Sequence, residues 1–152
     1  MIDTLQKYVS FYIDNKPYGI DLKYIQEFIE NVEYTPLPHK LNNIVGVANL
    51  RGRIITVVDM GNIFSELSCD NGGLLMVMRD SFIRGDMLKK PCVAFLVDKT
   101  GPIIEACSSE LIAIPSSDKN NNKICSHSLE QDNQVVSIVN AEKLYEMLND
   151  AK

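Results

Sequence analysis

The sequence has neither a long hydrophobic run nor an excess of basic residues, and each absence argues against a class of protein. Its longest apolar runs are short, as in residues 93–97, whereas a membrane-spanning helix needs about 20 apolar residues. Lys and Arg number 15 against 20 Asp and Glu, a formal charge of -5, whereas a nucleic-acid-binding domain usually has a basic excess. The first residues also lack the pattern of a secretory signal, so we expect a cytoplasmic protein that spans no membrane.

Motifs for catalysis and metal binding are missing as well. The four cysteines form no CxxC pair: Cys69, Cys92, Cys107 and Cys125. We expect them to be reduced, the last three as buried small hydrophobic residues. The two histidines, His39 and His127, accompany no serine or cysteine signature, and the chain has no GxxxxGKS, HExxH or GxGxxG motif. These absences predict a protein without catalytic residues, bound metal or cofactor.

The sequence does contain a series of short apolar strands separated by turns. Alternating residues at 8–13, followed by the turn residues 14–17, predict a hairpin. Residues 44–58 read as two strands around a tight Arg51-Gly52 turn, where glycine can adopt a positive φ. Further strands are predicted at 74–78, 92–97, 103–106, 124–128 and 135–139. Many short strands of this kind favour a β-barrel or sandwich over a βαβ fold.

Helices are predicted to be short, and exposed loops to be few. Helical spacing of apolar residues predicts one or two turns over 22–29, with Asp21 as the N-cap. Asp59 and Asn140 are predicted to cap a short helix ending at Phe64 and a C-terminal helix, respectively. Residues 79–91 and 115–123 are predicted to be exposed loops.

Two patterns recur along the chain at almost the same offset. An apolar strand, an Asp or Asn cap and a short amphipathic helix occur at 57–64 and again at 138–145. A strand ending in Asp, with a Glu six or seven residues later, occurs at 18–27 and again at 95–105. The order is the same in both copies, which indicates a duplicated small β unit; coincidence of common strand and cap patterns is the alternative.

These residues resemble a known family. Residues 18–21, 25–29 and 44–60 are similar to the signature of CheW-type chemotaxis coupling proteins, and residues 93–98 and 136–144 resemble that family's second half. The most specific part is Asn49-Leu50-Arg51-Gly52, preceded by glycine and followed by an apolar strand that ends at Asp59. The resemblance runs from about Lys7 to Leu148, which is nearly the entire chain.

The resemblance implies a mostly β fold: two five-stranded SH3-like β-barrels packed together, with short helices and a C-terminal helix. Residues 1–152 would form one CheW-like domain of two similar subdomains, in approximate halves 7–68 and 72–148, and an exchange of strands between them stays open. The implied function is that of a non-enzymatic adaptor, monomeric in isolation and recruited to membrane receptor arrays. It would couple the cytoplasmic tips of methyl-accepting chemoreceptors to the regulatory domain of the histidine kinase CheA.

The resemblance also carries over two charged positions. Glu27 and Arg51 match an acid and an arginine that pair in relatives. An arginine binds a carboxylate in bidentate fashion and would tie the first predicted helix to the Arg51-Gly52 turn. A role in receptor or kinase binding and a purely structural role are both open for this pair.

Four apolar or small residues complete the candidate receptor- and kinase-binding set. Ile25 and Gly46 match positions near the receptor contact in relatives. Ile25 is also explained as core, and Gly46 as a position where a β-carbon would crowd a neighbouring strand. Leu96 and Val97 are candidates for lining a groove between the barrels, or are core residues of an apolar strand.

The chain departs from the family pattern at two places, and other functions compete. Residues 124–128 replace the usual apolar, small and glycine sequence, and the 79–91 loop is long enough to bind a partner. A coupler in another receptor pathway, such as pilus-based motility, would share the fold. A small β-barrel that binds nucleic acid is a further alternative, because Tyr8, Phe11 and Tyr12 lie in one predicted strand and two arginines flank the turn at 51–52, although the acidic total argues against it.

Overall fold

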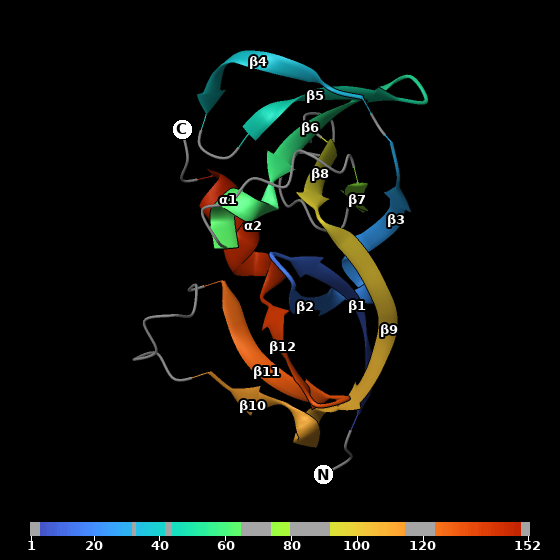
Figure 1. Ribbon diagram of the computed structural model, residues 1–152, viewed down its shortest axis with the longest axis vertical. Helices are drawn as coiled ribbons and strands as arrows, with labels where there is room; N and C mark the ends of the chain where they lie inside the picture. Colours follow the sequence, from blue (N-terminus) through green and yellow to red (C-terminus); the bar gives the residue numbers. More distant parts are fainter. Residues whose placement is uncertain are drawn as a thin grey trace.

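The computed structural model describes residues 4–31, 33–41, 44–64, 74–79, 92–114 and 124–149, with side chains for all of these except 38–41, 62, 148 and 149. Their strands form two six-stranded sheets, one above the other in Figure 1. Sheet A runs in the order β10 (Ile112–Ala113), β11 (Cys125–Gln131), β12 (Gln134–Val139), β2 (Lys16–Asp21), β1 (Leu5–Ile13), β9 (Lys99–Cys107). Sheet B runs in the order β3 (Ile25–Ile29), β7 (Leu74–Met78), β8 (Cys92–Val97), β6 (Arg53–Asp59), β5 (Ile44–Leu50), β4 (Thr35–Leu41).

The two sheets have the same strand order once the chain is shifted by six strands. In sheet A, six is added to the numbers of β1 and β2 and subtracted from those of the other strands. The order then becomes β4-β5-β6-β8-β7-β3, which is sheet B read from its opposite edge. Both sheets are antiparallel except for one pair, β2 with β12 in sheet A and β6 with β8 in sheet B. Each sheet therefore combines strands from both copies of the repeated sequence unit, because β2 and β6 belong to the first copy and β8 and β12 to the second.

Three tight turns connect neighbouring strands in the part of the chain that the structure describes. The two central residues of each turn have positive φ: Asp14 and Asn15 between β1 and β2, Arg51 and Gly52 between β5 and β6, Asp132 and Asn133 between β11 and β12. Two consecutive positive φ values define the turn type that matches the twist of antiparallel strands, and Asn, Asp and Gly adopt them at low cost. The predicted hairpins at 8–20 and 44–58 are confirmed.

The helices are capped as predicted. The Asp59 carboxylate accepts a hydrogen bond from the Gly61 amide (2.9 Å) at the start of α1 (Met60–Phe64). The Asn140 side chain accepts from the amides of Glu142 (3.0 Å) and Lys143 (3.2 Å) at the start of α2 (Ala141–Asn149). These bonds satisfy amides that have no partner within the helix. Two 3-10 turns, η1 (Leu22–Tyr24) and η4 (Ser108–Glu110), complete the described helical residues.

The described apolar side chains form two clusters, and the larger one joins the sheets. Phe11 and Ile13 of β1 lie in the same cluster as Phe95 and Leu96 of β8, each at most 1% exposed. The smaller cluster lies within sheet A: Tyr8, Ile104, Ala106, Leu129, Val136 and Ile138. Strand β1 supplies both clusters because successive side chains of a strand point to opposite faces. The two sheets are thus held together mainly by the burial of apolar surface.

Several local predictions need correction. The helix predicted over 22–29 is wrong: only Leu22–Tyr24 forms a 3-10 turn, and Ile25–Ile29 is strand β3, paired with β7. So short a helix is marginal by itself, whereas the strand gains ladder hydrogen bonds. Strand β4 contains Pro36, which is tolerated because β4 is an edge strand of sheet B.

The cysteine prediction is partly wrong. Cys125 is buried, but Cys92 and Cys107 are half-buried, and all three are free thiols. Three predicted features lie outside the described residues: Cys69, the loop at 115–123, and the loop at 79–91 apart from Arg79. The departure from the family pattern at 124–128 coincides with a bulge in β11, where the register against β12 shifts between Cys125 and His127.

Candidate functional site

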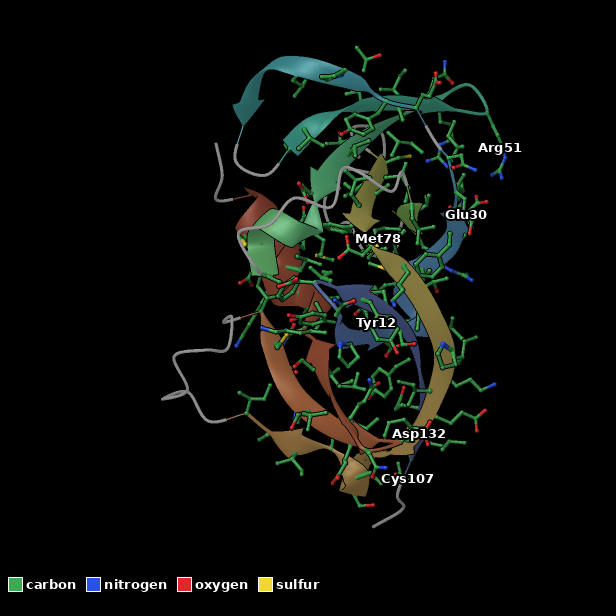
Figure 2. All side chains as sticks on the ribbon, viewed as in Figure 1. Tyr12, Glu30, Arg51, Met78, Cys107 and Asp132 are labelled. Atoms are coloured by element: carbon green, nitrogen blue, oxygen red, sulfur yellow. The ribbon has the colours of Figure 1, made fainter. Side chains whose placement is uncertain are left out.

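Arg51 lies at the tip of the β5–β6 hairpin, where the turn projects it from sheet B (Figure 2). The Asn49 side chain accepts a hydrogen bond from the Gly52 amide (3.0 Å) and braces this turn. Gly52 has a φ of 86° and nothing lies within 4 Å of the position that a β-carbon would take. The glycine is therefore needed for its backbone conformation, and the turn places the Arg51 side chain at the surface.

The structure brings Arg51 and Glu27 together. The two terminal nitrogens of Arg51 donate to the two carboxylate oxygens of Glu27 at 2.7 and 2.8 Å, which is the bidentate geometry. The Gln26 side-chain amide donates to the same carboxylate at 3.1 Å. Glu27 lies on strand β3, so the pair links β3 to the β5–β6 hairpin and not to a helix, which corrects that part of the expectation.

Both partners of the pair are charged at neutral pH. The hydrogen bonds from Arg51 and, secondarily, from Gln26 lower the pKa of Glu27 from its ordinary value of 4.5 to about 2. The hydrogen bond and the negative charge of Glu27 in turn raise the pKa of Arg51. The Arg51 side chain is 65% exposed and that of Glu27 26%. A partner protein would therefore meet a guanidinium held in one orientation by the carboxylate.

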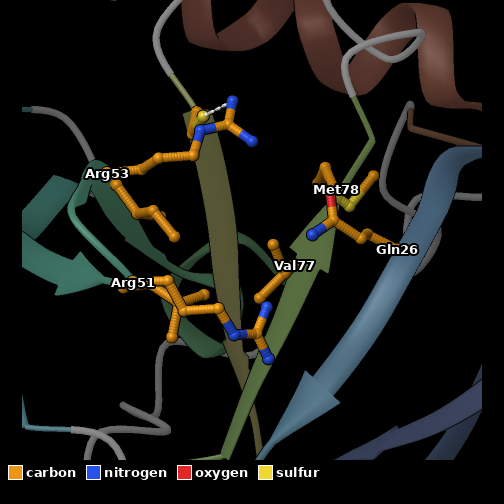
Figure 3. A pocket seen from close by; sticks show the side chains of 8 residues that line it. Gln26, Arg51, Arg53, Val77 and Met78 are labelled. Carbon is orange, nitrogen blue, oxygen red and sulfur yellow. Dashed lines mark hydrogen bonds between the residues drawn. The ribbon is translucent and has the colours of Figure 1, made fainter.

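A hollow of about 240 Å³ adjoins the pair at this end of sheet B. Figure 3 shows Arg51 and Arg53 on one side and Val77, Met78 and Gln26 on the other. Ile55 and Cys92 also line it, together with Leu50. The Arg53 guanidinium donates a hydrogen bond to the Cys92 sulfur, drawn as a dashed line in Figure 3. The site thus combines exposed cationic groups with an apolar floor.

Three of the other candidate residues are core residues. Ile25 is 4% exposed and Leu96 and Val97 are 0% exposed, and all three belong to the larger apolar cluster. In this conformation their side chains pack against neighbouring strands, so a partner would not touch them directly. They contribute to a binding surface only indirectly, because they hold β3 and β8 in position.

Gly46 is also enclosed. A β-carbon built there would lie 2.3 Å from the Thr35 carbonyl oxygen and 2.7 Å from the Tyr34 ring. Since Gly46 pairs with Pro36 of β4, any larger residue would push the two strands apart. Gly46 therefore permits close packing of β4 on β5.

Sequence reasoning missed the hollow and the part of Arg53 in it. Arg53 follows Arg51 by two residues across a predicted hairpin turn, and that spacing was the available signal. Met78 and Cys92 are far from Arg53 in sequence and come together only because β7, β8 and β6 are neighbours in sheet B. Among the residues described, no cluster of three or more His, Cys, Asp or Glu has the arrangement of a metal site. No described helix is long and apolar enough to span a membrane.

Two six-stranded sheets that are joined by the larger apolar cluster, with a charged hairpin at one end of sheet B, place the chain in the class of mostly β proteins. Comparisons with known proteins identify its family: the CheW-like domain model matches residues 7–149. The chain belongs to the CheW-like family, whose members are chemotaxis scaffold proteins and not enzymes. The mostly β fold with two SH3-like subdomains is confirmed. Each sheet contains six strands among the residues described, where five per barrel were expected.

Relatives support this assignment. The chain is 31% identical over 123 residues to "Chemotaxis protein CheW" of Thermotoga maritima, which covers 78% of this chain and 76% of the relative. It is 23% identical over 145 residues to the protein of the same name from Helicobacter pylori, covering 93% and 82% of the two chains. The crystal structure of scaffolding protein TtCheW from Thermoanaerobacter tengcongensis superposes with a TM-score of 0.74 at 21% identity, covering 90% and 89%.

Proposed function

We propose that this protein is a cytoplasmic adaptor of chemotaxis that couples methyl-accepting chemoreceptors to the histidine kinase CheA. The single observation that carries the proposal is the match of the CheW-like domain model to residues 7–149. The named relatives, "Chemotaxis protein CheW", support it. The protein acts by binding two partners and turns over no substrate, and it is recruited from the cytoplasm to receptor arrays at the membrane.

The partners are the cytoplasmic tip of the receptor and the regulatory domain of the kinase. Residues 1–152 act as one domain with two subdomains, whose cores are sheets A and B, and the protein is a monomer in isolation. Interfaces of this kind bury about 1,000 to 1,600 Å² in total. The bidentate Glu27–Arg51 pair supports a receptor-binding role for this end of sheet B, because it fixes an exposed cation on a rigid hairpin.

The remaining candidate residues contribute to binding indirectly. Ile25 holds the start of β3, and so the strand that carries Glu27, in the core. Leu96 and Val97 anchor β8 beneath the surface, and Gly46 lets β5 approach β4. We expect substitutions at these four positions to weaken binding through the shape and stability of the sheet.

Titration of the protein with a CheA regulatory domain and with a receptor-tip fragment, separately and then together, tests the proposal. A coupler binds both partners at once, so a ternary complex is expected in analytical ultracentrifugation. Mutual exclusion of the partners, or binding to neither, would contradict coupling. A coupler of another receptor pathway would bind its own receptor and kinase and not these two.

Arg51 can be tested separately from folding. Arg51→Ala is expected to weaken receptor binding more than it lowers the unfolding midpoint, and Arg51→Asn is the sharper variant. Asn-Gly is the preferred sequence for this turn type, so Arg51→Asn keeps the hairpin while it removes the guanidinium. Loss of receptor binding by Arg51→Asn at an unchanged midpoint would support the role of Arg51. Equal losses of stability and binding in both variants would show that the pair is purely structural.

A further inference from the structure

Among the described strands, the chain passes from one sheet to the other at two places. Strand β2 of sheet A is followed by β3 of sheet B through the 3-10 turn η1, and β8 of sheet B is followed by β9 of sheet A (Figure 1). Three residues make the first crossing, whereas Asp98 alone makes the second, since β8 ends at Val97 and β9 begins at Lys99. A connection of one residue has no slack, so the contacts of Asp98 affect how the two sheets lie relative to each other.

Both the backbone and the side chain of Asp98 are bound to the β1–β2 hairpin of sheet A. Its amide donates to the Tyr12 carbonyl oxygen (3.0 Å), and its carboxylate accepts from the Asp14 amide (2.7 Å). The next residue extends this contact, because the Lys99 ammonium lies 5.0 Å from the centre of the Tyr12 ring, within cation–π range. On the other side of Asp98, Val97 is buried and pairs with β7 of sheet B. Asp98 thus lies between the ladder of sheet B and three contacts with sheet A.

The corresponding aspartate of the repeated sequence pattern, Asp21, forms a local bond. Its carboxylate accepts from the Lys23 amide (3.0 Å), two residues later, at the start of η1. Asp98 and Asp14, in contrast, are 84 positions apart. The same side chain therefore caps a turn in one copy of the pattern and joins two distant segments in the other. This difference indicates that the long-range bond is not a by-product of the repeated strand.

We propose that Asp98 is a positioning residue that fixes the orientation of sheet B relative to sheet A. The larger apolar cluster holds the sheets together without specifying a direction, because apolar burial is non-directional. The hydrogen bond from the Asp14 amide is directional and is formed at the crossing itself. A fixed orientation would let an adaptor place its two partners at a defined distance and angle, a consequence that rests on the proposed function.

Residual dipolar couplings of the backbone amides test the orientation without any partner. In the wild-type protein, one alignment tensor should fit both sheets. Asp98→Ala removes the carboxylate and keeps the amide bond to Tyr12, so each sheet should still fit a tensor of its own while the common fit is lost. The Asp14 amide should also exchange with water about five-fold faster, which corresponds to roughly 1 kcal/mol.

Two matched variants separate positioning from general stability. Asp98→Asn keeps a side-chain oxygen that can accept from the Asp14 amide, so it should restore the common fit. Asp21→Ala removes the local bond at the other crossing, so it should lower the unfolding midpoint about as much as Asp98→Ala and keep the common fit.

Three outcomes would overturn the proposal. The first is a common fit that survives in Asp98→Ala, and the second is a common fit that is lost equally in Asp98→Asn or in Asp21→Ala. Asp98→Ser, which has a shorter side chain, is the second test variant. Failure of both Asp98→Ala and Asp98→Ser to fold is the third outcome, because it would show a general structural role.

The consequence for coupling is tested by energy transfer between a dye on a kinase regulatory domain and a dye on a receptor-tip fragment. Asp98→Ala should bind each partner within about two-fold of the wild-type affinity, the usual limit for sites that share no contacts. The distribution of distances between the two dyes in the ternary complex should be broader, and Asp98→Asn should narrow it again. An unchanged distribution beside a changed sheet orientation would overturn this consequence alone. A wild-type protein that forms no ternary complex would contradict the proposed function and leave the result on orientation standing.

Discussion

Replacement of Gly46 by alanine adds a single carbon atom at a place where backbone fills the space. The new β-carbon would lie 2.3 Å from the Thr35 carbonyl oxygen, about 1 Å closer than the 3.4 Å at which ordinary contacts begin. The Tyr34 ring at 2.7 Å could rotate away, but Thr35 belongs to β4 and pairs with Val47 of β5. Strand β4 must therefore move as a unit, and its ladder to β5 weakens.

The expected cost follows from overpacking. Extra carbon atoms in a well-packed region cost about 1 to 3 kcal/mol of unfolding free energy. For a chain of this size, each kcal/mol lowers the unfolding midpoint by about 2 to 4 °C. Gly46→Ala should therefore unfold about 2 to 12 °C below the wild-type protein in a thermal melt followed by circular dichroism.

Gly52 provides the matched control, because its substitution destabilises the fold for a different reason. It has open space around its α-carbon but a φ of 86°. Asparagine tolerates that conformation better than alanine does, so Gly52→Asn should be milder than Gly52→Ala. At Gly46 the order should reverse, since the larger asparagine adds to the clash. A wild-type melting midpoint for Gly46→Ala, or the same order of variants at both glycines, would refute the reasoning.

Two further predictions concern titration and thiol reactivity. Because the folded pKa of Glu27 lies below its ordinary value of 4.5, the ion pair stabilises the fold above pH 4.5, and this contribution is lost as the pH falls towards 2. An NMR titration should give a Glu27 pKa of about 2, which should return towards 4.5 in Arg51→Asn. An unchanged Glu27 pKa in the variant would contradict the assignment of the shift to Arg51. Burial raises the pKa of the Cys125 thiol to about 12. Thiol-specific reagents at pH 8 should therefore modify Cys92 before Cys125 in the folded protein, which mass spectrometry of timed samples can measure. Faster labelling of Cys125 would contradict its burial.

The duplicated architecture explains how one small chain can present two different ends. Both sheets have the same strand order and both have a tight two-residue hairpin at one end. Sheet B carries Arg51 on its turn, whereas sheet A carries Asp132 on its equivalent turn. Since a tight turn of this kind constrains backbone conformation more than side-chain charge, the two hairpins are free to carry opposite charges. An adaptor with two partners needs such a difference between its surfaces.

Local chemistry explains the elements that were predicted correctly. The Asp14-Asn15 and Arg51-Gly52 turns, the caps Asp59 and Asn140, and the alternation of Val9, Phe11 and Ile13 all act within a few residues of themselves. Positive φ values, cap hydrogen bonds and the two-residue period of a strand need no distant partner.

Long-range pairing explains what the sequence left open. Residues 25–29 carry apolar groups at a spacing that suits either a short helix or a strand, and pairing with β7 decides for the strand. The pairing of Glu27 with Arg51 was available only from family resemblance, because nothing local joins residues 24 positions apart. The hollow depends on the same long-range order, since β7, β8 and β6 must be neighbours for Met78, Cys92 and Arg53 to meet.

The sequence by itself determined the Asp14-Asn15 and Arg51-Gly52 turns and the helix caps at Asp59 and Asn140, because those features depend on backbone conformation and hydrogen bonds between near neighbours. Only the tertiary structure decided which strands lie side by side, that β2 pairs with β12 and β6 with β8, and so which charges meet at the surface. The reason is that the pairing is selected by the burial of apolar surface from the whole chain at once, which no local pattern specifies.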